Sequence, residues 1–316
     1  MPLATKKNPK TEKFTPAAID VEPLPREAGE EQPSVPKVTA LVYSYNRAAA
    51  LRRCIAALER TTDRQLVEIL VVDKGSQDES PHLDSEFPNT TFLRLPRNFG
   101  NTKALNIGMR TGVGEFVLFL DPEVEVQPDT VSRLLAALEL DGDAVAVAPL
   151  ITDPAGSPVE QAFRLPTPQA GLSTVPVPIN PGGEPIPVEY AGFVALMARK
   201  YFIRGINYLD DRYGEFGADA ELAFQIRRAG RKTVVLPDTR VVQHRIPEPV
   251  SGAVENLLTA DRVNGAAVYL GKHYGFMTGL GFRIGQILKA VLSLRFALVV
   301  ALVSGEKVDG SQSVIL

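Results

Sequence analysis

Short apolar runs alternate with amphipathic segments along the chain from residue 38 onward. The predicted strands are the β-branched and aromatic runs 38–45, 67–73, 91–96, 115–121 and 144–151. The predicted helices between them cover 47–60, 103–112 and 128–140. Strands and helices that alternate at this spacing indicate the α/β fold class, with a mainly parallel sheet that helices cover on both faces.

The second half of the chain has a less regular pattern. Residues 152–187 hold nine prolines and no periodic apolar spacing. They are therefore predicted to form a long loop that is either functional or disordered. After this loop, the pattern predicts a helix over 218–230, a strand over 232–237 and a set of helices over 251–304.

This pattern divides the chain into three parts. Residues 1–36 carry seven prolines, many charges and few large apolar side chains. Such a composition cannot offset its ordering entropy, so a disordered tail is predicted. Residues 37–250 are predicted to form the α/β domain, and residues 251–316 a C-terminal helical segment. The N-terminal residues lack the apolar stretch of a secretory signal peptide.

Composition and charge narrow the choice of partners. With 316 residues, 45% of them hydrophobic, the chain can bury a sizeable core. A formal net charge of −3 gives no support to wholesale nucleic-acid binding. The single cysteine, Cys54, excludes an intrachain disulfide and favours a reducing compartment. Its place in an apolar helical pattern predicts a small core residue.

Carboxylates follow two of the predicted strands. Asp73 ends the run "VEILVVD", and Asp121 ends "EFVLFLD" and is followed by Pro122 and Glu123. Ligands of parallel sheets bind beyond the carboxyl ends of the strands, so these side chains are expected at the rim of a ligand site. Asp121 and Glu123 are hard oxygen donors, and Mg²⁺ or Mn²⁺ bound there could bridge a diphosphate. A nicotinamide dinucleotide is not expected, because no Gly-x-Gly-x-x-Gly follows the first strand.

The chain resembles family 2 glycosyltransferases in four stretches, which occur in the family's order over about residues 37 to 246. These stretches are "ALVYSYNRAAALRRCIAAL", "EILVVDKGSQDES", "RNFGNTKALNIGMRTGVGEFVLFLDPE" and "YGEFGADAELAFQIRRAGRKTVVLPDTRVVQH". The resemblance implies a Rossmann-like, glycosyltransferase A-type sheet that binds a nucleotide-diphospho-sugar, here with C-terminal helices added. It also implies that the enzyme inverts the anomeric carbon of the sugar it transfers.

The resemblance implies roles for the residues that match the family's motifs. Asp73 matches the aspartate that contacts the nucleotide base, and Asp219 matches the catalytic base of the family's Glu-Asp-x-Asp-Leu. The implied metal ligands are Asp121, Glu123 and His244, with Mn²⁺ or Mg²⁺ as the cofactor. The implied substrate-binding residues are Tyr43, Ser44, Asn46, Asp73, the Arg-Asn-x-Gly residues Arg97, Asn98 and Gly100, and Lys103.

Two positions depart from the family's pattern. Glu123 stands where the Asp-x-Asp motif has its last aspartate, which moves a carboxylate by one methylene group. Ala218 replaces the acidic neighbour of the catalytic base, although the base itself is retained. Glu221, two residues after that base, could simply pair with Arg227 or Arg228 along its helix.

Structural roles compete with the implied chemical ones. Asp73 could form a strand-end turn, and Asp121 with Glu123 could form a solvated turn. A lone histidine such as His244 is usually structural. Arg97 is explained about as well by a surface charge as by a contact with phosphate.

The C-terminal segment is basic and apolar. Residues 282–303 read "FRIGQILKAVLSLRFALVVALV", but Lys289 and Arg295 interrupt the run, so it falls short of the ~20 clean residues of a spanning helix. Between Asp261 and Glu306 there is no acidic residue. The side chains that share a helical face are Ile284, Ile287, Leu288, Val291 and Leu292. A basic amphipathic helix that lies on an anionic membrane surface is predicted; the alternative is a helix that packs on the protein's own core or at a dimer contact.

The expected function is that of a metal-dependent, inverting hexosyl- or deoxyhexosyltransferase in cell-surface polysaccharide or glycolipid synthesis. The expected donor is a UDP-, dTDP- or GDP-sugar, and the expected acceptor is a saccharide or a lipid-linked sugar. A homo-oligomer is compatible with the sequence, and the expected location is the cytoplasm, free or peripheral on the cytoplasmic face of the membrane. The alternative, which the two departures favour, is a non-catalytic nucleotide-sugar-binding or scaffold protein of the same fold.

Overall fold

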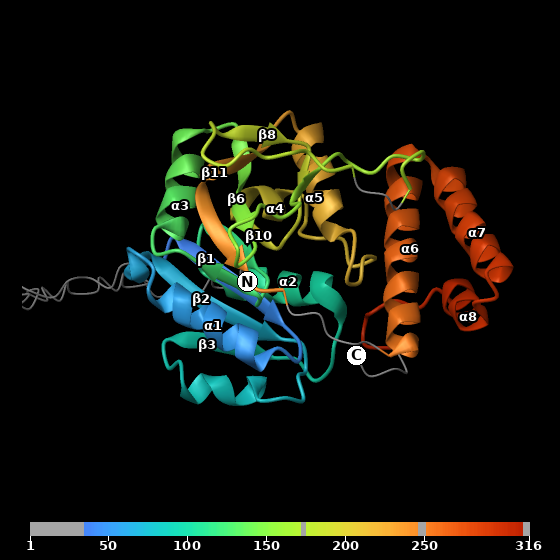
Figure 1. Ribbon diagram of the computed structural model, residues 1–316, viewed down its shortest axis with the longest axis horizontal. Coiled ribbons are helices and arrows are strands. Elements are labelled where there is room, and N and C mark those ends of the chain that lie inside the picture. The colour runs from blue at the N-terminus through green and yellow to red at the C-terminus, as the bar shows by residue number, and fades with distance from the viewer. Residues whose placement is uncertain (1–34, 172–174, 246–250, 312–316) are drawn as a thin grey trace, which may run out of the picture. The chain divides into compact units, whose positions relative to one another are not determined.

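A nine-stranded sheet organises the computed structural model, which describes residues 35–171, 175–245 and 251–311 (Figure 1). The strands lie in the order β3-β2-β1-β4-β10-β6-β11-β5, and β8 pairs with β11. Their bounds are β1 Val38–Ser44, β2 Val67–Asp73, β3 Thr90–Arg94, β4 Phe116–Leu120, β5 Val124–Val126, β6 Ala144–Thr152, β8 Ile186–Val188, β10 Ala195–Arg199 and β11 Lys232–Gln243. A two-stranded sheet joins β7 Ala162–Phe163 to β9 Tyr190–Ala191.

Most of the central pairings are parallel. β1 pairs in parallel with β2 and β4, β2 with β3, and β6 with β11. The exception at the centre is β10, which runs antiparallel between β4 and β6. The predicted α/β class with a mainly parallel sheet is confirmed, but the sequence pattern did not reveal the antiparallel strand at its centre.

Helices cover both faces of the sheet (Figure 1). One core lies between the sheet and helices α1 and α3, and it includes Leu51, Cys54 and Leu134. The other lies between the sheet and helices α2, α4, α5 and α6, and it includes Leu105 and Tyr269. The helices span α1 Ala48–Glu59, α2 Gly100–Thr111, α3 Thr130–Leu140, α4 Lys200–Gly205, α5 Ala218–Arg228 and α6 Gly252–Tyr274. Cys54 is fully buried, which confirms its prediction as a core residue.

Two further helices follow α6, namely α7 Phe276–Leu292 and α8 Phe296–Ser304. They pack with α6 around a small core that includes Val263, Ala290 and Leu302. Their outer side is apolar and exposed, because Leu292 and Phe296 have 85% and 66% of their surface in solvent. In the described part of the chain, no helix has both the length and the apolar character needed to cross a membrane.

Several sequence predictions differ from the structure in detail. The strand predicted at 232–237 continues as β11 to Gln243, with a shift of register between Leu236 and Arg240. The stretch predicted as a loop over 152–187 contains β7 and the start of β8. The predicted disordered tail lies outside the described residues up to residue 34. The boundary predicted at residue 250 stays a prediction.

Candidate active site

The carboxyl ends of three neighbouring parallel strands bring the first candidate residues together. Ser44 at the end of β1 is in register with Asp73 at the end of β2. Val42 is in register with Leu120, so Asp121 leaves β4 at the same edge of the sheet. Because strands β2, β1 and β4 are adjacent and parallel, their terminal polar side chains meet at one rim, where open α/β sheets bind ligands.

Asp73 anchors the loop that follows β2. Its carboxylate accepts hydrogen bonds from the main-chain nitrogen of Ser76 at 3.3 Å and from the Ser76 hydroxyl. That hydroxyl in turn accepts from the Asn46 nitrogen at 2.8 Å, and the Asn46 side chain accepts from the nitrogen of Gln77 at 2.8 Å. Burial raises the pKa of Asp73, and the bonds from Ser76 partly offset this rise. The loops after β1 and β2 are thus joined into one wall.

The loop after β3 carries Arg97, Asn98 and Gly100. The Asn98 side-chain oxygen accepts from the Gly100 nitrogen at 2.9 Å, and this bond shapes the entry to α2. Arg97 and Lys103 each lie 5.2 Å from the centre of the Phe99 ring. The loop therefore presents two basic side chains around one aromatic ring, a cation–π arrangement.

The Asp121–Glu123 segment forms a tight turn between β4 and β5. The side-chain oxygen of Asp121 accepts from the Glu123 nitrogen at 2.9 Å, which is the bonding of an Asx turn. Burial raises the pKa of Asp121, and the nearby charge of Glu123 adds to the rise. Glu123 itself is buried and pairs with Arg47 at 3.3 Å. Two carboxylates are thus held close together, one of them against a guanidinium.

His244 follows β11, which pairs with β5 and brings the histidine beside this turn. Its main-chain nitrogen donates to the Glu123 carbonyl oxygen at 2.9 Å. Its ring Nε2, however, lies 2.8 Å from the Glu125 carboxylate. Among the described residues, no three histidine, cysteine, aspartate or glutamate side chains are arranged to hold a metal ion. The hard oxygens of Asp121 and Glu123 suit Mg²⁺ or Mn²⁺, whereas the ring of His244 is held by Glu125.

Asp219 is the second residue of α5. The helix is preceded by Gly217, whose φ of +103° lies in the left-handed region that favours glycine. Its Oδ1 accepts from the Ala220 nitrogen at 2.9 Å, and its Oδ2 accepts from the Tyr190 hydroxyl at 2.7 Å. Burial raises the pKa of Asp219, while the bond from Tyr190 lowers it. Tyr190 was not predicted as its partner, because it lies 29 residues earlier in the chain.

The hydroxyl of Tyr43 donates to the Phe193 carbonyl oxygen at 3.4 Å, and a Cβ added at the preceding Gly192 would lie 3.4 Å from Oδ2 of Asp219. Burial raises the pKa of this phenol well above its usual value, and the charges of Asp121, Asp219 and Glu215 raise it further. Carboxylates from three separate segments therefore lie within electrostatic reach of one hydroxyl. Of the predicted residues, this brings Asp121 and Asp219 to the same region.

A buried ion pair next to this region was missed by the sequence reading. Lys74 lies 2.8 Å from Glu215, and both side chains are about 90% buried. Lys74 also donates to the side-chain oxygen of Asn101 at 2.8 Å, and the Asn98 amide reaches the same glutamate at 3.4 Å. Both residues could have been noticed from their closeness in sequence to predicted site residues, since Lys74 follows Asp73 directly and Glu215 stands four residues before Asp219.

Comparison with known proteins supports a glycosyltransferase A-type fold for this sheet. Residues 39–168 match the model of the family described as Glycosyl transferase family 2. The N-acetylglucosaminyl-diphospho-decaprenol L-rhamnosyltransferase of Mycobacterium tuberculosis is 28% identical over 231 residues, 65% of this chain and 75% of the relative. The succinoglycan biosynthesis protein ExoO of Rhizobium meliloti is 34% identical over 116 residues, 36% of this chain and 33% of the relative.

Solved structures share the fold. Staphylococcus aureus TarS 1–349 in complex with UDP-GlcNAc has a TM-score of 0.54 and 17% identity, and the match covers 85% of this chain and 80% of that chain. GalNAc-T7 with UDP, GalNAc and Mn²⁺ has a TM-score of 0.57 and 19% identity. That match covers 69% of this chain and 45% of the other. These likenesses confirm the predicted glycosyltransferase A-type fold.

Proposed function

We propose that this protein is a metal-dependent, inverting glycosyltransferase that moves a sugar from a nucleotide-activated donor to a saccharide or lipid-linked acceptor in cell-surface polysaccharide or glycolipid synthesis. One observation carries the proposal. The chain between β9 and β10 touches both carboxylate residues: the Asp121 nitrogen donates to the Val194 carbonyl oxygen at 2.9 Å, and a Cβ added at Gly192 would lie 3.4 Å from Oδ2 of Asp219. A candidate donor-binding carboxylate and a candidate base therefore lie in one region.

The donor is proposed to bind along the rim of β2, β1 and β4. Asp73 would accept hydrogen bonds from the nucleotide base, and Tyr43, Ser44 and Asn46 line the neighbouring loop. Arg97, Asn98, Gly100 and Lys103 would face the ribose and the phosphates. The joined loops after β1 and β2 support this assignment, because a rigid wall fixes a flat base at low entropic cost.

Asp219 is proposed as the general base. It would take the proton of the acceptor hydroxyl while that oxygen forms a bond to the anomeric carbon, and the bond from that carbon to the diphosphate oxygen would break on the opposite face. The nucleoside diphosphate leaves with the electron pair. A carboxylate whose pKa burial raises accepts a proton more readily at neutral pH than a solvated one.

Asp121 and Glu123 are proposed to hold the metal together with the donor diphosphate, and His244 would join them if it leaves Glu125. The metal, Mn²⁺ or Mg²⁺, would neutralise charge on the leaving diphosphate. Burial is the main cause of the raised pKa of Asp121, and the charge of Glu123 adds to it. Two carboxylates at one turn would fit such an ion, since the ion would offset the repulsion between them.

The exposed apolar side of α7 and α8 is proposed to lie on an anionic membrane surface. The relative from Mycobacterium tuberculosis is named for a lipid-linked acceptor, and basic residues accompany the apolar side chains along these helices. A location on the cytoplasmic face of the membrane would then give access to a lipid-linked acceptor. If α7 and α8 serve membrane binding, the chain divides into a catalytic domain over 37–250 and a helical segment over 251–316, and we propose this division.

A second candidate is a nucleotide-sugar-binding protein without activity. It is favoured by the existing partners of two proposed metal ligands, because Arg47 pairs with Glu123 and Glu125 holds His244. Hydrolysis of UDP-, dTDP- and GDP-sugars, measured with and without Mn²⁺, decides between the two. Metal-dependent turnover of one donor is the expected result, whereas tight binding of a donor with no turnover or transfer favours the second candidate.

A further inference from the structure

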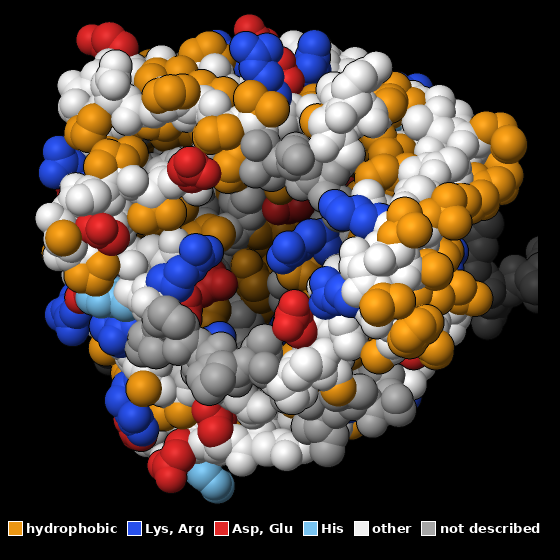
Figure 2. Space-filling view, turned by 45° about the vertical axis from the view of Figure 1, so that its right-hand side comes forward, with side chains coloured by type: hydrophobic (Ala, Val, Ile, Leu, Met, Phe, Trp, Pro, Cys, Tyr) orange, Lys and Arg blue, Asp and Glu red, His pale blue; other side chains and the backbone are white. Residues whose placement is uncertain are grey.

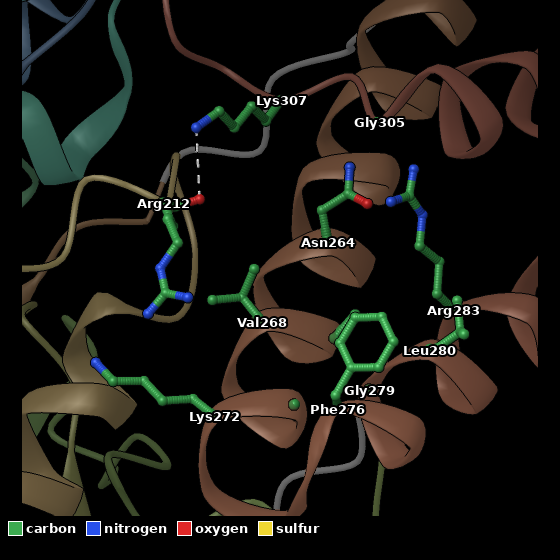
Figure 3. A pocket seen from close by; sticks show the side chains of 12 residues that line it. Arg212, Asn264, Val268, Lys272, Phe276, Gly279, Leu280, Arg283, Gly305 and Lys307 are labelled. Carbon is green, nitrogen blue, oxygen red and sulfur yellow. Dashed lines mark hydrogen bonds between the residues drawn. The ribbon is translucent and has the colours of Figure 1, made fainter.

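A pocket of 490 Å³ is lined by α6 and α7, by Arg212 from the segment before α5, and by Gly305 and Lys307 from the segment after α8 (Figure 3). Sites for small molecules have volumes of about 300–1,000 Å³, so this pocket has the size of a ligand site. It is separate from the proposed donor site. None of the residues that line it is among the residues proposed to bind the donor or the metal.

The pocket has a strongly positive lining. Arg212, Lys272, Arg283 and Lys307 line it, and none of the described residues in its lining is acidic. Figure 3 shows Arg212, Lys272 and Lys307 on one side of α6 and Arg283 on the other. Four cations around one small volume repel each other unless anions compensate them.

Two of these cations have acidic partners behind the pocket wall. Arg212 lies 2.7 Å from Asp210, and Lys272 lies 2.7 Å from Glu221. Their charges are therefore largely balanced within the protein.

The other two cations are weakly balanced. Arg283 donates to the carbonyl oxygens of Leu302 and Val303 at 2.6 and 3.3 Å, and no described carboxylate pairs with it. Lys307 lies 3.9 Å from Asp309, at the limit of an ion pair. The pocket therefore carries a surplus of positive charge that an anion would neutralise.

The rest of the lining is apolar. Val268, Phe276 and Leu280 lie between the basic groups (Figure 3), and Phe276 has 73% of its surface exposed. The apolar side of α7 and α8 continues from this wall, and Figure 2 shows hydrophobic side chains gathered over this part of the molecule, on the right of the view. A ligand that suits both parts of the pocket has an anionic head and an apolar chain.

Chain segments that line the pocket lead from it to the candidate active site. Lys307 donates to the carbonyl oxygens of Asp211 and Arg212 at 3.4 and 3.5 Å. The segment from Arg212 leads to Asp219 seven residues later. On the other side of Lys307, the main chain at Val308 lies against Gly100, where an added Cβ would come within 2.4 Å of its carbonyl oxygen.

We propose that this pocket binds the diphosphate head of a lipid-linked acceptor, while the apolar side of α7 and α8 lies against the membrane that holds the lipid. That the ligand is an acceptor rests on the proposed function. That it has an anionic head and an apolar chain rests on the lining of the pocket alone. Arg283 and Lys307 supply the surplus charge that recognises the diphosphate, and Phe276 and Leu280 contact the first part of the lipid chain.

The test compares two kinds of phosphatidylcholine vesicle with equal negative charge, one containing a polyprenyl diphosphate and the other phosphatidylglycerol. The wild-type protein is expected to bind the diphosphate vesicles more tightly. The double variant Arg283→Gln with Lys307→Gln is expected to lose about a hundredfold in affinity for the diphosphate vesicles alone, since each of the two lost hydrogen bonds to a charged group contributes on the order of tenfold. Glutamine at 283 still donates to the carbonyl oxygen of Leu302.

Two controls separate charge from specific recognition. Lys289→Gln with Arg295→Gln removes two exposed charges outside the pocket and should weaken binding to both kinds of vesicle equally. Arg283→Lys keeps the positive charge and should therefore keep part of the preference for diphosphate that the double variant loses. The proposal is overturned if the wild type shows no preference, or if the double variant at 283 and 307 keeps it. If inorganic pyrophosphate displaces the protein completely from diphosphate vesicles, the lipid chain adds nothing to binding, and the proposed contacts with that chain are overturned.

Donor binding, measured on the same proteins, separates this inference from the proposed function. If a nucleotide-sugar binds and is turned over but vesicles reveal no preference for diphosphate, the pocket assignment alone fails. If the preference is present and no nucleotide-sugar binds, the function fails and the pocket assignment stands.

Discussion

The hydroxyl of Tyr190 donates a 2.7 Å hydrogen bond to Oδ2 of Asp219, across 29 residues of chain. This bond favours the ionised carboxylate, whereas burial favours the protonated one. The two effects act against each other on the group proposed to accept the proton. We therefore expect Tyr190 to position Asp219 and to set the basicity of its carboxylate.

Asp219→Asn is expected to reduce turnover by on the order of 10² to 10⁴, the usual contribution of a general base. Binding of the nucleotide-sugar should barely change, because the base is proposed to face the acceptor. Steady-state transfer and calorimetric donor binding measure the two quantities separately. Transfer that survives the substitution would show that another group takes the proton.

Tyr190→Phe is expected to move the acid limb of the kcat/KM profile to higher pH. Loss of the hydrogen bond removes a stabiliser of the carboxylate, so the pKa of Asp219 rises further and the base is protonated over a wider range. Tyr274→Phe is the matched control, since that hydroxyl bonds to the Pro166 carbonyl oxygen. An acid limb that stays in place, or moves to lower pH, contradicts the assigned role of Tyr190.

Glu123→Gln is expected to weaken nucleotide-sugar binding in Mn²⁺, because it removes one proposed metal ligand with little change in shape. It also releases Arg47 from its 3.3 Å ion pair. The comparison is therefore made with and without Mn²⁺, and only the metal-dependent part of the affinity reports on the ligand. Equal affinities of the wild type and the variant in Mn²⁺ would exclude Glu123 from the metal site.

The parallel part of the fold was predictable because each buried strand is a continuous apolar run. β2 matches its predicted bounds, residues 67–73. β10 was not assigned, since Ala195–Arg199 is short and its direction depends on contacts with β4 and β6, which are distant in sequence. Pairing partners of this kind leave no periodic signal along the chain.

For the candidate site, sequence position predicted the strand-end carboxylates but not their partners. For Glu221, the sequence left open an ion pair with Arg227 or Arg228 along its helix. It is instead buried against α6, where Lys272 and His273 each lie 2.7 Å from its carboxylate. Helical spacing identifies neighbours on the same helix, whereas a buried carboxylate needs hydrogen-bond or ion-pair partners, and here the ion-pair partners come from a second element.

Asp261 is expected to make the protein less stable as pH rises from about 4 to about 6. Its buried carboxylate accepts from the nitrogens of Glu215, Phe216 and Val308, and burial raises its pKa to about 6. A group with a raised folded-state pKa holds its proton more tightly in the folded protein, so its contribution is largest below the unfolded pKa and declines by on the order of 3 kcal/mol across that window.

Asp261→Asn abolishes this titration, whatever constant cost the substitution adds. From pH 4 to pH 6, the unfolding free energy of the wild type should therefore fall relative to that of this variant. Asp210→Asn is a control, because hydrogen bonds from Arg212 hold the pKa of Asp210 well below its usual range. The contribution of Asp210 is therefore lost only as pH falls below about 4, and its difference from the wild type should stay nearly constant from pH 4 to pH 6. A difference between the wild type and Asp261→Asn that stays constant across the window would refute the assignment.

Leu292→Glu is expected to weaken binding to anionic vesicles about tenfold or more, because burial of one leucine side chain contributes roughly 1.5–3 kcal/mol. Leu292 is 85% exposed on α7, so the substitution should leave the fold intact. Leu140→Glu is the matched control, since Leu140 is 90% exposed at the end of α3. Sedimentation with anionic vesicles at low salt measures the effect. Absence of wild-type binding would refute the membrane assignment, and a variant that instead dissociates a wild-type dimer would assign this side of the molecule to a second copy of the chain.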